Sequence, residues 1–363
     1  MRNFAFTLTI GTVLILVCAS AYAQENLRPF SEILDQSGKI HPDITTGSFD
    51  ACGYSMQAAP DGGPVFAKAT EDSNWDSCFG LSGVNGVVFA IALDSMGNVY
   101  AGGNFNTVGG MSANYIAKWN GTTWEDLGSG MNNLVRAILV IGSDVYVGGD
   151  FTTAGGVSAN YIAKWNGLSW EAMGSGMNER VYDLAVIGSD VYAGGEFTTA
   201  GGMSANRIAK WNGTSWEALG SGLNDHVFTL AVSDSDVYVG GRFTAAGGVS
   251  ANRIAKWNGS SWDSLGSGMN GEVFDLVVSG SDVYAGGLFT TADGVSANRI
   301  AKWNGSSWDS LGSGMNGEVF DLVVSGSDVY AGGLFTTADG VSANRIAKWN
   351  GSSWDSLGSG MNG

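Results

Sequence analysis

Short apolar runs and glycine-rich turns alternate along most of the chain with a fixed step. The pattern Val-Tyr-x-Gly-Gly recurs six times, always 46 residues apart, starting at Val99, Val145, Val191, Val237, Val283 and Val329. Two tryptophans follow each copy at constant spacing, beginning with Trp119 and Trp124 and ending with Trp349 and Trp354. A period kept without drift over six copies indicates a repeated structural unit.

Each unit is predicted to contain four short strands. In the unit that begins at Val181, apolar runs and turn signals place the strands at residues 181–187, 191–193, 207–211 and 216–219. Gly194-Gly195 is expected to close the second strand, because glycine adopts backbone angles that side chains forbid. Residues 196–206 are predicted to form a loop. Asn212-Gly213 is a hairpin signal, since both residues tolerate a positive φ.

Four antiparallel strands in 46 residues are typical of a β-propeller blade, so the predicted class is an all-β propeller. A single blade cannot bury both of its faces and must pack against its neighbours. We expect the twelve paired tryptophans to supply this packing rather than a sugar-stacking surface. An open β-solenoid is disfavoured because its coils usually repeat every 20 to 30 residues, as an order of magnitude.

The segments outside the repeats suggest further parts. Residues 1–23 combine Arg2, an apolar run and Ala21-Tyr22-Ala23, which predicts a cleaved secretory signal and a secreted or cell-envelope location. Residues 24–62 read as a partly irregular extension. Residues 63–86 are predicted to form a degenerate half blade that contains only a third and a fourth strand. In it, Trp75 matches the second tryptophan of a repeat.

The chain stops at Gly363, which aligns with the residue just before a first strand. We therefore expect six complete blades within residues 87–363, an incomplete seventh that includes residues 63–86, and a chain that is a fragment. A closed ring of six blades is the alternative. Residues 263–308 and 309–354 are identical, which indicates a recent duplication or an error in assembling repetitive DNA.

Composition narrows the class of partner. The net charge is −17, and removal of residues 1–23 with Arg2 leaves 16 basic and 34 acidic side chains, or −18. Such a surface repels nucleic acid and anionic lipid, and no membrane span is expected after signal removal. Cys52 and Cys78 are then the remaining cysteines, and both precede the repeats. They are candidates for a disulfide in an oxidising compartment, with two free thiols as the alternative.

The repeat resembles known propeller sequences. A strand ending in Gly148-Gly149, a strand ending in Trp165 and a strand opening with Trp170 resemble the kelch-type blade, although only four residues separate the two tryptophans. The full string VYVGGDFTTAGGVSANYIAKWNGLSWEAMGSGMN is more similar to the repeats of many secreted bacterial proteins and of the fungal cortical polarity-marker family. The resemblance covers residues 84–363 and implies the propeller fold.

The copies differ mainly in two places, after the glycine pair and around the start of the first strand. In a four-stranded blade both places lie at the same end, so the varied residues should gather on one rim around the channel. A constant scaffold with a varied rim predicts a non-enzymatic binding or scaffold protein that recognises an extracellular protein or glycan. Neutral drift at exposed positions is the alternative. The rim candidates are Asn104, Arg136, Asp150, Arg180, Tyr182, Asp183, Glu196, Asp225, His226, Arg242 and Asp275.

Recognisable catalytic chemistry is sparse. The kelch resemblance raises galactose oxidase, but the chain has only His41 and His226, and no cysteine lies within the repeats, so that copper site cannot be built. No nucleophile elbow accompanies a histidine and an acid. Acidic turns such as residues 233–236 match no calcium-loop spacing, so no cofactor is expected. A carbohydrate-active enzyme using Asp183 and Asp275 and a purely structural envelope protein remain the alternatives.

Overall fold

The structure is a computed structural model that describes residues 83–361 and six short strands before them. These strands are β1 (Phe6–Ile10), β2 (Val13–Val17), β3 (Arg28–Pro29), β4 (Phe49–Asp50), β5 (Tyr54–Ala58) and β6 (Pro64–Lys68). The chain divides into two compact units, Met1–Gly83 and Val84–Gly363. In the first unit β1–β2 and β5–β6 pair antiparallel and β3–β4 pair parallel.

Several predictions for the first unit fall where the structure gives no test. Cys52, Cys78 and Trp75 lie outside the described residues. Of the predicted half blade, β6 is paired with β5 in a separate two-stranded sheet, and residues 69–82 are outside the described part. The signal segment, the disulfide and the seventh half blade therefore stay predictions.

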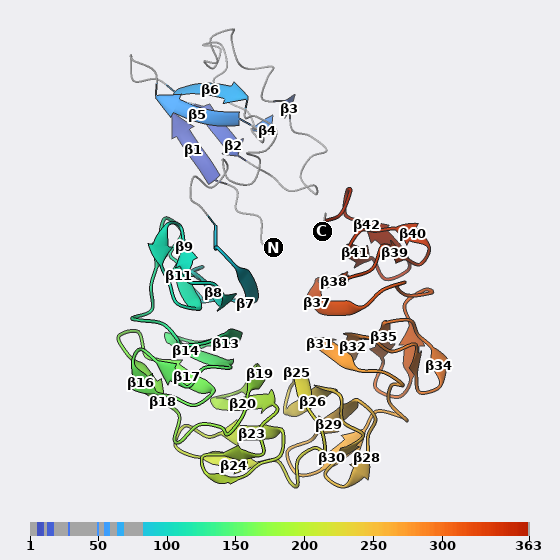
Figure 1. Cartoon of the computed structure of the whole chain (residues 1–363). Helices are drawn as coiled ribbons and strands as arrows, with labels where there is room; N and C mark the ends of the chain where they lie inside the picture. The colour runs from blue at the N-terminus through green and yellow to red at the C-terminus, as the bar shows by residue number, and fades with distance from the viewer. Residues whose placement is uncertain are drawn as a thin grey trace. The chain divides into compact units, whose positions relative to one another are not determined.

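The second unit is all-β, as predicted, with six sheets of four antiparallel strands arranged in a ring (Figure 1). Blade 1 contains β7 (Val87–Leu93), β8 (Val99–Asn104), β11 (Ile116–Trp119) and β12 (Trp124–Glu125). Blade 2 contains β13 (Val135–Ile141), β14 (Asp144–Gly149), β17 (Ile162–Trp165) and β18 (Trp170–Ala172). Blade 3 contains β19 (Val181–Ile187), β20 (Asp190–Gly195), β23 (Ile208–Trp211) and β24 (Trp216–Ala218).

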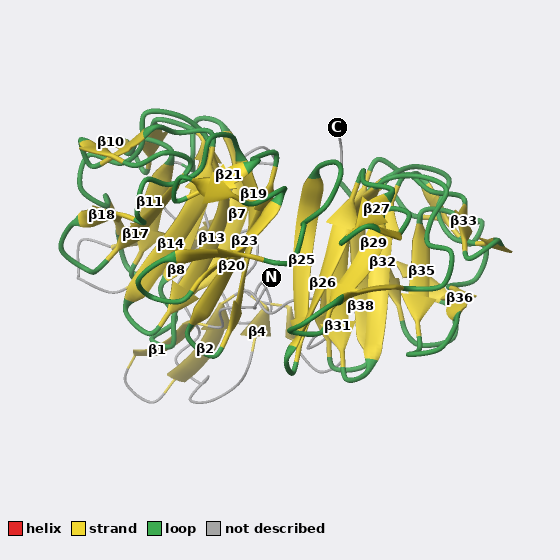
Figure 2. Ribbon diagram, turned by 90° about the horizontal axis from the view of Figure 1, so that it is seen from below, coloured by secondary structure: helices red, strands yellow, loops and turns green. Residues whose placement is uncertain are grey.

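The last three blades repeat this arrangement. Blade 4 contains β25 (Val227–Ser233), β26 (Asp236–Gly241), β29 (Ile254–Trp257) and β30 (Trp262–Ser264). Blade 5 contains β31 (Val273–Ser279), β32 (Asp282–Gly287), β35 (Ile300–Trp303) and β36 (Trp308–Ser310). Blade 6 contains β37 (Val319–Ser325), β38 (Asp328–Gly333), β41 (Ile346–Trp349) and β42 (Trp354–Ser356). The first strand of each blade lies nearest the channel, and the described residues form strands and loops without a helix (Figures 1 and 2).

The glycine pair ends the second strand, as predicted, but the predicted reason was wrong. Gly194 and Gly195 are the last two residues of β20, and neither has a positive φ. A Cβ atom on Gly194 would lie 2.6 Å from Val227 Cγ1 of the next blade, and one on Gly195 would lie 2.0 Å from the Arg180 carbonyl oxygen. Glycine is required here because other backbone and side-chain atoms approach too closely for any side chain.

The loop predicted at residues 196–206 holds a small hairpin. Its strands are β21 (Thr199–Ala200) and β22 (Met203–Ser204), joined at Gly201 and Gly202, whose φ angles are 59° and 83°. The other blades contain the same hairpin as β9 (Thr107–Val108) with β10 (Met111–Ser112), β15 (Thr153–Ala154) with β16 (Val157–Ser158), β27 (Ala245–Ala246) with β28 (Val249–Ser250), β33 (Thr291–Ala292) with β34 (Val295–Ser296), and β39 (Thr337–Ala338) with β40 (Val341–Ser342).

The hairpin between the third and fourth strands forms where Asn212-Gly213 predicted it, but by a different mechanism. Only Gly213 has a positive φ, of 97°. The Asn212 side-chain oxygen instead accepts hydrogen bonds from the backbone N–H groups of Thr214 and Ser215, at 3.0 and 2.9 Å. The asparagine thus stabilises the turn through its side chain.

The first strand of every blade carries one extra residue. In blade 3 the register with β20 shifts between Val181 and Asp183, so Tyr182 is an additional residue in the strand. Shifts at the equivalent place occur in the other five blades. A bulge of this kind re-aims the side chains around it, and it determines what lines the channel. The extra residues are Phe89, Arg136, Tyr182, Phe228, Phe274 and Phe320.

The hydrophobic core lies between blades. The cluster between blades 2 and 3 joins Tyr146 and Ile162 of blade 2 to Val181, Leu184 and Trp216 of blade 3. Four further clusters join the other successive pairs in the same way. Trp216 is 3% exposed, as blade packing predicted.

The second tryptophan also bonds each blade to the one before it. Its indole N–H donates to a buried carbonyl 43 residues earlier in the chain. The five pairs are Trp170 with Leu127 at 2.7 Å, Trp216 with Met173 at 2.9 Å, Trp262 with Leu219 at 2.9 Å, Trp308 with Leu265 at 3.0 Å and Trp354 with Leu311 at 2.9 Å.

We predict that Trp216→Phe destabilises the fold more than Trp211→Phe. Both changes replace a partly or fully buried indole by a smaller phenyl ring. Only Trp216→Phe also leaves the Met173 carbonyl without its hydrogen-bond donor. An unsatisfied buried group costs about 1–3 kcal/mol. Urea unfolding followed by far-ultraviolet circular dichroism measures the difference, and equal losses in the two variants would contradict the role of this bond.

Candidate functional site

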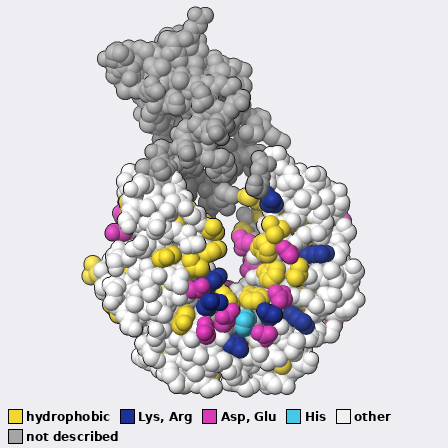
Figure 3. Space-filling view, in the orientation of Figure 1, with side chains coloured by type: hydrophobic (Ala, Val, Ile, Leu, Met, Phe, Trp, Pro, Cys, Tyr) yellow, Lys and Arg dark blue, Asp and Glu magenta, His cyan; other side chains and the backbone are white. Residues whose placement is uncertain are grey.

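The varied loops meet at one end of the channel. The connection from the second to the third strand and the connection into the next first strand both lie at this end of a blade. Figure 3 shows charged side chains of both signs and a histidine gathered around a central hollow. We call this region the channel mouth and define it by Arg136, Asp150, Arg180, Tyr182, Glu196, Asp225, His226, Arg242 and Glu272.

A constant asparagine holds the two loops of each blade together. In blade 3 the Asn178 side-chain oxygen accepts hydrogen bonds from the N–H groups of Thr198 and Thr199, at 2.8 and 2.9 Å. The Glu196 N–H also donates to the Arg180 carbonyl at 2.9 Å. Because these bonds use backbone and unvaried residues, the side chains at positions 180 and 196 can change without moving the loops.

The charged side chains of blades 2 and 3 are paired. The Arg136 guanidinium contacts both carboxylate oxygens of Asp150, at 2.5 and 2.9 Å. Arg180 lies 3.5 Å from Asp150 and 3.4 Å from Glu196, so it joins the two acids. The Asp150 bond raises the pKa of Arg136.

The pairing continues into blades 4 and 5. The Tyr182 hydroxyl donates to Glu196, and His226 Nδ1 lies 3.5 Å from the same carboxylate. Burial and the Glu196 carboxylate raise the pKa of Tyr182 to about 12, so the phenol keeps its proton at neutral pH.

Two further ion pairs extend this row of charges. Arg242 lies 4.0 Å from Asp225 and 3.3 Å from Glu272, and His226 Nε2 lies 3.6 Å from Asp225. Basic and acidic side chains therefore alternate across four blades.

The structure separates the predicted rim residues into three groups. Eight of them meet at the channel mouth, namely Arg136, Asp150, Arg180, Tyr182, Glu196, Asp225, His226 and Arg242. Asn104 is exposed at the end of β8 and takes no part in the charged row. Asp183 and Asp275 lie outside the charged row and form hydrogen bonds between blades. Glu272, which pairs with Arg242 at the mouth, was not among the predicted site residues.

An aromatic belt lines the channel, and its phenylalanines were missed from the sequence. It consists of the aromatic bulge residues Phe89, Tyr182, Phe228, Phe274 and Phe320, with Arg136 at the sixth position. Ring centroids lie 5.7 Å apart for Tyr182 and Phe228, 6.1 Å for Phe228 and Phe274, and 5.5 Å for Phe274 and Phe320. The Arg136 guanidinium lies 5.2 Å from the Tyr182 centroid and 5.8 Å from that of Phe89. These phenylalanines were not singled out in the sequence. The signal that identifies them is a large side chain at this position in every copy.

In the first strands, the residue after each belt residue belongs to a polar layer, which includes Asp183, Thr229 and Asp275. The Asp183 carboxylate accepts hydrogen bonds from the N–H of Leu184 at 2.8 Å and from the N–H of Leu230, in the next blade, at 2.6 Å. The Asp275 carboxylate likewise accepts from Leu322 of blade 6 at 2.7 Å. These acids therefore join neighbouring blades.

In blade 4, Thr229 occupies the position that Asp183 has in blade 3 and Asp275 has in blade 5. Its hydroxyl accepts a hydrogen bond from the Leu276 N–H at 3.2 Å and donates to Asp275 at 3.1 Å. A neutral side chain thus makes the bond between blades that the acids make elsewhere.

Burial changes the protonation of this layer. Although the Asp183 side chain is only half-buried, desolvation by the surrounding protein raises its pKa to about 7, against the bonds from the two N–H groups. The pKa of Asp275 is raised well above its usual value by burial and by the charges of Asp321 and Asp183. An acid with such a pKa keeps its proton at mildly acidic pH.

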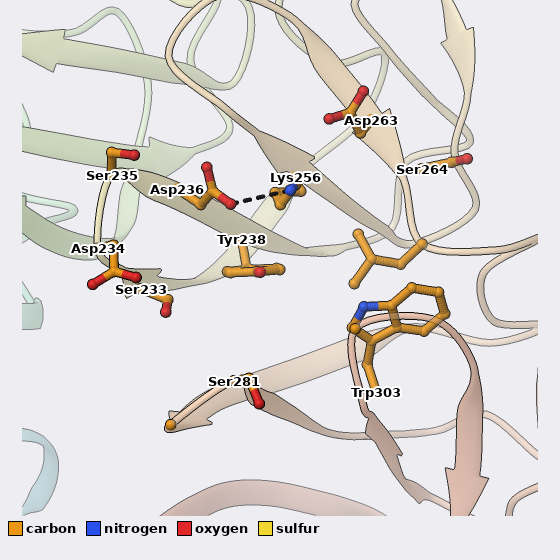
Figure 4. A pocket seen from close by; sticks show the side chains of 13 residues that line it. Ser233, Asp234, Ser235, Asp236, Tyr238, Lys256, Asp263, Ser264, Ser281 and Trp303 are labelled. Atoms are coloured by element: carbon orange, nitrogen blue, oxygen red, sulfur yellow. Dashed lines mark ion pairs between the residues drawn. The ribbon is translucent and has the colours of Figure 1, made fainter.

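A second cleft lies between blades 4 and 5 at the opposite end of the strands (Figure 4). It includes the acidic turn of residues 233–236. The Asp236 carboxylate pairs with the Lys256 ammonium at 3.0 Å. The part of the chain that the structure describes contains no group of three or more His, Cys, Asp or Glu placed to hold a metal ion. In the same residues, no helix is long and apolar enough to cross a membrane.

The raised pKa of Asp183 predicts how stability depends on pH. Between about pH 4 and pH 7 the folded state binds the Asp183 proton more tightly than the unfolded chain, so stability falls as the pH rises through this window. We expect a smaller loss between pH 5 and pH 8 for Asp183→Asn than for the natural chain. Urea unfolding at both pH values measures it, with Asp126→Asn as the exposed control. An unchanged pH dependence in Asp183→Asn would contradict the assignment.

Comparison with known proteins supports the fold. Residues 212–363 match the family model described as the Rax2 C-terminal beta propeller domain. No curated protein matches the chain. Three solved structures are similar over 76% of this chain.

The first is the extracellular domain of the putative hybrid two component system BT4673 from B. thetaiotaomicron, with 14% identity and a TM-score of 0.50 over 34% of that protein. The second is titled "YCF48 bound to D1 peptide", with 12% identity and a TM-score of 0.49 over 82% of that protein. The third is the computationally designed Ika8 protein, with 16% identity and a TM-score of 0.44 over 98% of it. The likeness to the first structure concerns the fold alone. The kelch-like and secreted bacterial character of the chain stays a prediction.

Proposed function

We propose that this propeller is a non-enzymatic binding module, secreted or held in the cell envelope, that recognises a protein partner through the channel mouth. One observation carries the proposal. Most of the ionisable residues that vary between otherwise constant repeats come together in a single row of paired charges at one end of the channel. Exposed positions that drift independently have no reason to pair with one another across blades.

The geometry favours a protein over a glycan as the partner. Side chains of alternating sign suit a surface that itself carries both signs, and such complementarity provides specificity. The pairs already formed hold the arginines in place, which lowers the entropy lost on binding.

A carbohydrate-active enzyme is the second candidate, because an acid with a pKa of about 7 suits general acid catalysis. The bonds that Asp183 and Asp275 accept from neighbouring blades give these acids a structural role that accounts for their position. Turnover of a polysaccharide by the purified chain, lost in Asp183→Asn but retained in Asp126→Asn, would favour the enzyme.

We predict that charge reversal at the mouth weakens partner binding. The natural chain is screened by biolayer interferometry against purified extracellular proteins and a glycan array, and the tightest protein partner is measured again with Arg180→Glu and Arg242→Glu. Each change replaces a cation in the charged row by an anion, so affinity should fall at least about tenfold, or about 1.4 kcal/mol. Binding should also weaken as salt is added.

Leu168→Glu is the control, because Leu168 is exposed in the hairpin between the third and fourth strands, away from the mouth. It adds a negative charge without touching the charged row. Binding that survives both arginine changes but is lost in Leu168→Glu would contradict the proposal, and so would a glycan as the tightest ligand.

A further inference from the structure

Most basic side chains of the propeller are paired with an acid. In residues 83–361, each lysine and each arginine of the charged row lies within 3.4 Å of a carboxylate oxygen. The arginines of this range that form no ion pair with a described residue are Arg207, Arg253, Arg299 and Arg345. A chain with a net charge of −17 therefore leaves its unpaired cations at one repeated position.

Three of these arginines lie between described blades on both sides. Arg207, Arg253 and Arg299 precede the third strands of blades 3, 4 and 5, and we call them the arginine arc. Their φ angles are 67°, 64° and 64°. Glycine is favoured in this left-handed region, because a Cβ atom lies too close to the following carbonyl oxygen. A long side chain is thus present here in spite of a steric cost.

Backbone hydrogen bonds fix each arginine of the arc at the mouth end of its blade. The Arg253 N–H donates to the Phe243 carbonyl at 2.8 Å, and the Arg253 carbonyl accepts from the Gly241 N–H at 3.0 Å. Gly241 and Phe243 flank Arg242, a member of the charged row. The arc therefore lies beside this row, and Figure 3 shows basic side chains around much of the hollow.

Packing does not require arginine at this position. Blades 1 and 2 carry Tyr115 and Tyr161 there, at φ angles of 65° and 64°, and both tyrosines pack against core clusters between blades. The Nε atoms of Arg253 and Arg299 are buried and have no hydrogen-bond partner among the described residues. A buried donor without an acceptor is destabilising. The charge, and not the packing, is therefore what the arginines add.

We propose that the arginine arc binds carboxylate side chains of an acidic segment in the protein partner, an inference that rests on the proposed function. A guanidinium binds a carboxylate through two parallel N–H bonds. Nε and one Nη form such a pair once the side chain turns Nε towards the ligand. The bound carboxylate then supplies both the missing counter-charge and the missing acceptor. Because the backbone of each arginine is already fixed, less entropy is lost on binding.

Neighbouring acids favour a protein segment over a polyanionic glycan. The Arg207 Nη1 group donates to the Glu196 carbonyl, so the arc begins beside an acidic residue of the charged row. Asp225 and Glu272 continue that row into blades 4 and 5. A polymer that is negative along its whole length is repelled by these acids and by the net charge of the chain. A protein can place acidic side chains on the arc and basic ones on the row.

The test uses the full chain and a fluorescein-labelled dodecapeptide of alternating glutamate and glycine, whose binding is followed by fluorescence anisotropy. Arg253→Tyr combined with Arg299→Tyr should weaken binding at least tenfold, because two charges are lost while the new residue is the one that blades 1 and 2 carry. The matched control is Lys256→Gln combined with Lys302→Gln. It removes the same charge from the same blades at the opposite end of the strands, so affinity should change less than twofold.

Two kinds of outcome overturn the proposal with the peptide alone. One is the absence of peptide binding, or equal weakening in the two double variants. The other is tighter binding of heparin than of the peptide, which would identify a polyanionic glycan as the ligand.

The protein partner of the channel mouth separates this inference from the proposed function. Partner binding that is lost in Arg180→Glu but unchanged in the double tyrosine variant overturns the arc and leaves the proposed function intact. If no protein partner is found while the peptide still binds the arc, the proposed function fails and the carboxylate site is supported.

Discussion

The structure depends on the contact between one blade and the next. Each four-stranded sheet has two apolar faces, and the described core is divided into clusters that combine residues from two successive blades. The Gly194–Val227 contact and the Trp216–Met173 bond bring the sheets close enough to exclude water between them. The glycine, the valine and the second tryptophan of this interface recur in every copy of the repeat, so the same contact forms at each of the five internal boundaries.

The contrast between the packed contacts of the blades and the loops at the end of the channel explains the position of the candidate site. Residues that contact the next blade are constrained on both sides, whereas Arg180 and Glu196 extend from loops held by Asn178 and by backbone bonds. Change is therefore accommodated more readily at the mouth than at the contacts between blades. The polar layer is an intermediate case, since Asp183 and Thr229 are different residues that make the same bond to the next blade.

Much of the fold follows from the sequence, because a fixed period, apolar runs and turn residues are local signals. The first strand of blade 3 was predicted with its observed bounds. The function of Gly194 was not, because the atom that forbids a side chain there belongs to Val227, in another blade. Comparing the copies identified most of the charged row, although not that its members pair. The aromatic belt was missed because Phe228 and Phe274 follow from a bulge, which strand alternation does not predict.

Hydrogen exchange tests most directly the claim that blades are stabilised by their neighbours. Peptides from β7 and β25 differ in sequence and can be told apart by mass spectrometry, unlike those from the identical copies in blades 5 and 6. Both strands lie in four-stranded sheets, but only β25 is covered by blades on both sides. The account predicts that amides of β7 exchange much faster than those of β25. Equal protection of the two strands would contradict it.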